Sequence, residues 1–146
     1  MGYETQLAQG VAELLQTLGV GTWTPDGIYD PAQTGIYIRS VPDGPDRLIS
    51  LSTYTVGDDP SLSDSVVGMQ IRTRWGGADP RPVDDLADEI FTNLHGLAGI
   101  DLSTGIHITQ CLRQSAASLG QESDSRRWGR SDNYHLTVHR PSNNRQ

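Results

Sequence analysis

The sequence predicts an α+β domain: a mixed, mainly antiparallel sheet of about five strands with two helices packed on one face. Two stretches with helical spacing of apolar residues and five strand-like stretches support this prediction. They follow one another in the order helix, three strands, helix, two strands. The chain has 146 residues, enough for one core, so we expect a single domain over residues 1–146 with a flexible tail at 141–146.

The first helix is predicted at residues 5–18 and ends before Gly19. Its apolar residues share one side of the helix and are Leu7, Val11, Leu14, Leu15 and Leu18. Residues 20–35 are rich in Gly, Pro and Asp and form a predicted loop. Two strands follow at 36–41 and 48–56, and the turn-forming segment 42–46 between them predicts a β-hairpin.

The strand at residues 65–75 has the clearest alternation in the chain, which indicates one buried and one polar face. The apolar set is Val67, Met69, Ile71 and Trp75, and the polar set is Gln70, Arg72 and Arg74. After Gly76 and Gly77 the spacing becomes helical, with one apolar stripe from Val83 to Leu97. Asp84 and Asp85 lie near the start of this helix, where negative charge complements the helix dipole.

The last two strands are predicted at 106–112 and 133–140. Between them lies a polar, arginine-rich segment, residues 114–132, which we expect to form an extended loop or arm. A compact domain rarely keeps a loop of this length without a use for it. We expect the arm to be mobile in a free subunit.

Composition excludes several classes of function. The net charge is −7, and an acidic chain is a poor general binder of nucleic acid. The single cysteine, Cys111, excludes an internal disulfide and a cysteine-based zinc cluster. The N-terminus predicts no signal peptide, and no apolar stretch is long enough to cross a membrane. We therefore expect a soluble protein that works in the compartment where it is made.

No catalytic motif is present, and we predict no catalytic, cofactor-binding or metal-binding residue. Three histidines on predicted strands, His107, His135 and His139, leave one alternative open. They would line the pocket of a small binding domain or enzyme. His135 and His139 are four residues apart on one strand, roughly 13 Å, which is too far for a shared metal ion.

The segment Arg126–Arg130 is the strongest candidate for a binding surface. Tryptophan and arginine are enriched at protein–protein hot spots, whereas a tryptophan among cations also suits single-stranded nucleic acid. The acidic chain favours protein contact, with a plain surface loop as the third reading. Arg72 and Arg74 are expected to be exposed and either to join this surface or to face water. The expected interface residues are Arg72, Arg74, Trp75, Asp84, Asp85, Arg126, Arg127, Trp128 and Arg130.

Four stretches together resemble a known family: VAELLQTLGVG, VVGMQIRTRWGGADPRPVDDLADEIFTNLHG, GIDLSTGIHITQ and LGQESDSRRWGRSDNYHLTV. Their order and spacing are similar to those of the tail terminator and minor capsid (neck) proteins of long-tailed, siphovirus-type bacteriophages. The resemblance covers most of the chain and implies a structural protein of the virion, assembled in the host cytoplasm, without catalytic residues or cofactors.

The resemblance further implies that six copies form a ring on the last ring of the tail tube. This ring would stop tube polymerisation and join the tail to the head-side connector, while DNA passes through without specific binding. The partners are then the tail tube protein, the connector and other copies of the chain. Complementary charge between subunits is expected from the arginine loops and the acidic helix start at 84–89. The alternative is another neck protein, a head-completion or connector-adaptor protein.

Overall fold

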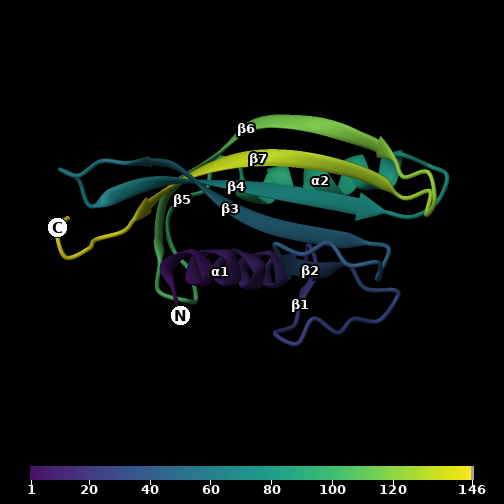
Figure 1. The fold of residues 1–146 in the computed structure, drawn as a ribbon, viewed down its shortest axis with the longest axis horizontal. Helices are drawn as coiled ribbons and strands as arrows, with labels where there is room; N and C mark the ends of the chain where they lie inside the picture. The colour runs from purple at the N-terminus through teal and green to yellow at the C-terminus, as the bar shows by residue number, and fades with distance from the viewer. Residues whose placement is uncertain (146) are drawn as a thin grey trace.

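The computed structural model describes residues 1–145, which form two helices and one seven-stranded sheet (Figure 1). The elements are α1 (Tyr3–Thr17), β1 (Thr22–Trp23), β2 (Gly35–Ile38), β3 (Leu48–Asp58), β4 (Asp64–Trp75), α2 (Arg81–Leu94), β5 (Ala98–Asp101), β6 (His107–Gln121) and β7 (Trp128–His139). The strand order is β1-β2-β3-β4-β7-β6-β5. The α+β class is confirmed, but the sheet has seven strands rather than about five, because β1 and β5 are too short to give a period.

The predicted hairpin between the second and third strands is wrong, because β2 and β3 run parallel, with Gly35 opposite Leu48. Two contacts extend the chain along β3 after β2 ends. The amide of Arg39 donates to the carbonyl of Leu51 at 2.9 Å, and Ser50 Oγ donates to the carbonyl of Ser40 at 2.8 Å. Residues 41–47 then return the chain to the same end of the sheet, so that both strands start there.

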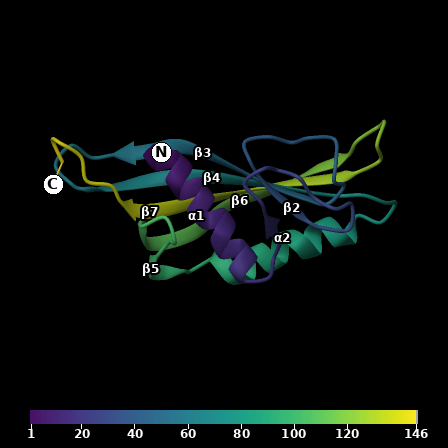
Figure 2. The same cartoon turned by 90° about the horizontal axis from the view of Figure 1, so that it is seen from below.

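Both helices lie on one face of the sheet, as expected (Figure 2). Helix α1 packs on β1, β2 and β3, and α2 packs on β4, β6 and β7. The apolar stripes of the two helices join the inward residues of the strands in one continuous core, which includes Leu7, Leu15, Met69, Ile90 and Tyr134. The opposite face of the sheet, here called the outer face, is not covered by a helix.

The alternation of the central strand is largely confirmed. Val67, Met69 and Ile71 are buried in the core, and Trp75 is half-buried beneath the Arg47 guanidinium, which lies 4.4 Å from its ring centre. Helix α2 ends at Leu94, one turn earlier than its apolar stripe suggests. The next residue, His95, is extended, and a left-handed Gly96 then turns the chain toward β5.

The expected arm at 114–132 is mostly β-structure. Strand β6 continues to Gln121 and β7 starts at Trp128, so only residues 122–127 form the tip of a long hairpin. The sequence gives no apolar alternation there because this half of β6 is exposed on both faces. Hydrogen bonding to β7, rather than burial, therefore holds residues 114–121 in the sheet.

The C-terminal segment lies against the turn between β3 and β4. Ser142 and Arg145 exchange backbone hydrogen bonds, and Arg145 Nη2 donates to Ser65 Oγ at 2.7 Å. Flexibility of residues 141–145 remains a prediction, and residue 146 lies outside the described residues. No helix within residues 1–145 has the length and apolar character needed to span a membrane.

Candidate assembly surface

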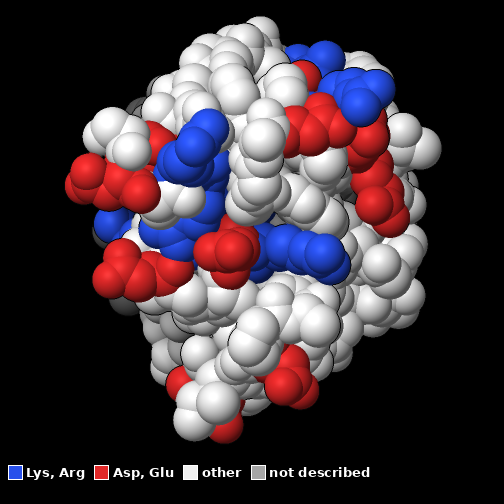
Figure 3. Space-filling model, turned by 90° about the vertical axis from the view of Figure 1, so that its right-hand side faces the viewer, with Lys and Arg blue, Asp and Glu red and all other residues white. Residues whose placement is uncertain are grey.

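The arginines expected at an interface gather at one end of the molecule. The loop 42–46, the end of β4 and the tip of the β6–β7 hairpin meet there. Figure 3 shows this end as a patch of arginine surrounded by acidic side chains. The contacts within the patch decide which of its charges remain free for a partner.

Arg74 is not exposed as expected: it is 2% accessible. Its Nη2 donates to the carbonyl of Pro45 at 2.7 Å, and its Nε donates to the carbonyl of Asp46 at 3.2 Å. Burial, and then the nearby charge of Arg127, lower the pKa of the Arg74 guanidinium from its ordinary value. Arg74 therefore holds the return loop between β2 and β3 and has no free face for a partner.

Arg127 is also buried, at 7% accessible. Its guanidinium lies 3.6 Å from Asp46 and 3.5 Å from Glu122, and it donates to the carbonyl of Asp43. Arg127 thus connects the hairpin tip to the same return loop that Arg74 holds. Arg127 therefore packs against its own subunit instead of extending from it, whereas its neighbour Arg126 is exposed.

Arg130 forms ion pairs with two carboxylates of its own chain, on the helix side of the sheet. Its Nη1 lies 3.1 Å from Asp84, and its Nε lies 2.8 Å from the buried Asp132. The hydrogen bonds that Arg130 donates, first the one to Asp132 and then the one to Asp84, raise the pKa of its guanidinium. Arg113 joins the same carboxylate of Asp132 at 3.3 Å. An arginine of β7 and the acidic start of α2 therefore pair within one subunit, whereas complementary charge was expected between subunits.

The remaining residues expected at the interface are exposed or half-buried. Asp85 is exposed, whereas Arg72, Trp75 and Trp128 are half-buried. The Nε of Arg72 and the Nε1 of Trp128 are buried without a hydrogen-bond partner among residues 1–145. Asp85 and Trp75 also border one shallow pocket, with Leu86 and Glu89.

Two of the three histidines are held by aspartates rather than by one another. His107 Nδ1 contacts Asp101 at 2.8 Å and His139 Nδ1 contacts Asp64 at 3.2 Å, and no hydrogen bond within residues 1–145 joins two histidines. The same residues contain no cluster of three or more His, Cys, Asp or Glu side chains able to hold a metal ion. His107 therefore stabilises the turn between β5 and β6, and His139 links the end of β7 to the start of β4.

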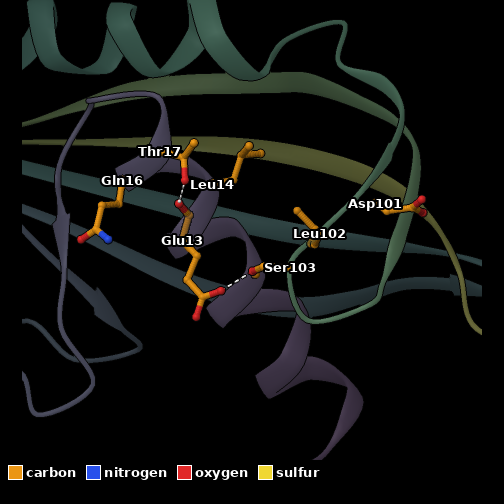
Figure 4. Close-up of a pocket in the computed structure, with 8 residues that line it drawn as sticks. Glu13, Leu14, Gln16, Thr17, Asp101, Leu102 and Ser103 are labelled. Atoms are coloured by element: carbon orange, nitrogen blue, oxygen red, sulfur yellow. Dashed lines mark hydrogen bonds between the residues drawn. The ribbon is translucent and has the colours of Figure 1, made fainter.

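A polar pocket of about 230 Å³ separates α1 from the loop after β5 (Figure 4). Glu13 points toward this loop and accepts a hydrogen bond from Ser103, while its backbone carbonyl accepts one from Thr17 at 2.9 Å. Thr104 Oγ1 also donates to the carbonyl of Gln6 at 2.6 Å. These contacts attach the loop to the helix, which is a structural task.

Two stretches of sheet edge stay open. Within residues 1–145, residues 114–121 of β6 make no backbone hydrogen bond on the side away from β7, and residues 54–58 of β3 make none on the side away from β4. Exposed edges are usually protected by charge or proline, but QSAASLGQ at 114–121 has neither. The two open edges lie at opposite ends of the sheet (Figure 1).

The chain matches one known protein family over most of its length. A family model described as "Bacteriophage tail terminator protein" matches residues 14–140, from the second half of α1 to the residue after β7. The chain belongs to this family. The resemblance drawn from the sequence is thereby confirmed. Membership supports a structural role in the phage tail, a place in the virion and contacts with other phage structural proteins, and it favours this role over catalysis.

A solved structure has a similar fold. A chain of the "Virion of native gene transfer agent (GTA) particle" matches with a TM-score of 0.57 and 19% identity, over 70% of this chain and 77% of that chain. At this identity the likeness concerns the fold alone. No curated protein matches the chain. The tail terminator assignment therefore rests on the family match.

Proposed function

We propose that six copies of this protein form a ring that caps the tail tube, ends tail polymerisation and joins the tail to the head-side connector. Membership of the tail terminator family over residues 14–140 carries this proposal. The partners are then other copies of the chain, the tail tube protein and the connector. The ring assembles in the host cytoplasm and remains in the virion.

The open sheet edges support ring formation. A ring of identical subunits joins one surface of each subunit to a different surface of its neighbour. The β6 edge at 114–121 and the β3 edge at 54–58 are different surfaces at opposite ends of one sheet. Neighbours that meet through such edges satisfy backbone groups that a single subunit leaves to water.

The charge distribution supports DNA passage without specific binding. Affinity for DNA depends on cations that are free to neutralise phosphates. Arg74, Arg127 and Arg130 instead bind carbonyls or carboxylates of their own subunit. The net charge of −7 adds a general repulsion between DNA and the ring.

Electron microscopy of particles from a virus that lacks only this protein tests the proposal. We expect tubes of irregular, excessive length that are not attached to heads. Tails of normal length beside unjoined or leaking heads would instead assign the protein to the head side of the neck, as a head-completion or connector-adaptor protein. Normal virions would contradict any role in tail or neck assembly.

A further inference from the structure

Leu119, near the tip of the β6–β7 hairpin, is a leucine whose side chain is exposed to solvent. Leu119 is 51% accessible, although it lies within β6. The pairing register of β6 with β7 shifts between Ser118 and Gly120, so Leu119 is the extra residue of a β-bulge. A bulge re-aims the side chain of its extra residue. Leu119 leans over Gly129, where an added Cβ would lie 3.4 Å from the Leu119 Cβ.

The same hairpin end offers an exposed cation. Arg126 lies in the tip, has a left-handed φ of 58° and makes no ion pair among residues 1–145. Its amide and carbonyl are held in the tip, by Glu122 and Gln121 respectively, at 2.9 Å each. The backbone is therefore fixed while the guanidinium stays free. Leu119 and Arg126 together are called the hairpin knob.

The opposite end of the molecule has a complementary pocket on the outer face. It measures about 530 Å³, is lined mainly by apolar atoms and lies over Val66 and Thr137. Leu62 borders it and is 57% accessible, a large exposure for a leucine in a polar turn. The carboxylates at its rim belong to Asp58, Asp59 and Asp64. This pocket is called the acidic-rimmed pocket.

We propose that the hairpin knob of one copy docks in the acidic-rimmed pocket of the next copy, with Leu119 in the pocket and Arg126 facing its rim. The inference rests on the proposed ring and specifies which residues join its subunits. Within one chain the two features cannot meet, because the hairpin tip and the turn between β3 and β4 lie at opposite ends of the molecule (Figure 1).

Chemistry and position both favour a second copy as the occupant. An apolar side chain meets an apolar pocket, and a free cation meets an acidic rim, which is the complementarity expected of a specific interface. Asp58 lies 3.9 Å from Arg145 and Asp64 contacts His139, so Asp59 is the rim carboxylate that makes no ion pair within residues 1–145. Both features also flank the open edges, because Leu119 lies on the β6 edge and Gly57 of the pocket lies on the β3 edge. The contact therefore continues the surface through which a ring would close.

Disulfide trapping tests this contact directly. Leu119→Cys protein is mixed with Leu62→Cys protein under mild oxidation and analysed on non-reducing gels. The native Cys111 does not interfere, because it is buried and burial raises the pKa of its thiol to about 12. We expect a disulfide-linked heterodimer from the mixture, and from the double variant a ladder that ends at one closed multimer.

The matched control replaces the pocket partner by Leu18→Cys, another exposed leucine at the end of α1 (41% accessible). We expect at least tenfold more heterodimer with Leu62→Cys than with Leu18→Cys. Equal yields overturn the inference. If wild-type protein still forms rings by electron microscopy in that case, the proposed ring stands and only this contact fails. Without rings, both fail.

Charge reversal tests the second half of the contact. Arg126→Asp suits the left-handed backbone, which aspartate tolerates better than most residues. We expect it to lower the yield of the Leu119→Cys and Leu62→Cys heterodimer several-fold at low salt, with a smaller effect at about 1 M salt, where screening is strong. The control Arg81→Asp changes an exposed arginine on α2. An equal loss with both changes contradicts the role of Arg126.

Discussion

Arg130 on β7 is paired with Asp84 in the first turn of α2, with 3.1 Å between its Nη1 and Oδ1 of the carboxylate. The two residues are 46 positions apart in the sequence. Arg130 also contacts Asp132, which is 3% accessible and accepts a hydrogen bond from Arg113. The pairs couple the hairpin to α2 and leave little of these charges for a neighbouring subunit.

Removing the buried carboxylate should destabilise the fold strongly. Asp132→Ala leaves the guanidinium groups of Arg113 and Arg130 without their shared partner. We expect the free energy of unfolding to fall by about 3–5 kcal/mol, the usual cost of breaking a buried ion pair on one side. Urea denaturation measures this, and Asp85→Ala, at an exposed carboxylate near the start of α2, should lower the unfolding free energy by at most about 1 kcal/mol. Equal effects would contradict a buried network.

Arg74 should matter for stability rather than for assembly. Arg74→Met removes the donors to the carbonyls of Pro45 and Asp46. We expect about 2–3 kcal/mol lower unfolding free energy, because several bonds from one charged donor are lost, and faster limited proteolysis of the loop 42–46. The exposed Arg81→Met should change neither quantity. A stable variant that fails to assemble would instead make Arg74 an interface residue.

Gly68 should be required because Tyr54 lies over it on the outer face. A Cβ at Gly68 would approach the Tyr54 ring to 2.2 Å, whereas one at Gly57 on the neighbouring strand meets nothing within 4 Å. We expect Gly68→Ala to cost about 1–3 kcal/mol by overpacking and Gly57→Ala far less. In a Tyr54→Ala background the cost of Gly68→Ala should shrink. Thermal or urea unfolding of the four variants checks this cycle, and an unchanged cost would rule out the clash.

The buried thiol should make the fold sensitive to alkaline pH. Burial raises the pKa of Cys111 from 9.0 to about 12. Between these values the unfolded chain has lost a proton that the folded chain keeps, so stability falls as pH rises. We expect about 1 kcal/mol more loss between pH 9 and 10 in the wild type than in Cys111→Ala, which has no thiol. Parallel urea titrations at the two pH values measure the difference, and identical losses would contradict it.

Amide exchange should separate the free subunit from the ring. The hairpin end is exposed, and the open β6 edge at 114–121 has no backbone partner on one side. In the free subunit we expect fast exchange at the tip, residues 122–127, and at the amides of 114–121 that point away from β7, and we expect protection of both after ring assembly. Exchange at the same rates in both states would show that this segment takes no part in assembly.

The sequence predicts the helices and strands in which apolar residues recur at a regular spacing along the buried face. The helix stripes and the alternation of Val67, Met69 and Ile71 correspond to buried positions. The second half of β6 was missed because an alternation signal reports burial, and residues 114–121 are exposed on both faces. The direction of β3 was missed because Arg74 and Ser50 fix the return loop through contacts distant in sequence.

The α+β class, the two helices on one face and the resemblance to tail terminators can all be predicted from the sequence, since they depend on local periods and on the order of segments. Which charges are free depends on contacts between residues that are distant in the sequence. Arg74, Arg127 and Arg130 bind carbonyls or carboxylates of their own subunit. Leu119 and Arg126 remain exposed and can contact a neighbouring subunit. A sequence pattern cannot show this, because an arginine or a leucine is the same residue in the sequence whether the fold pairs and buries it or leaves it exposed.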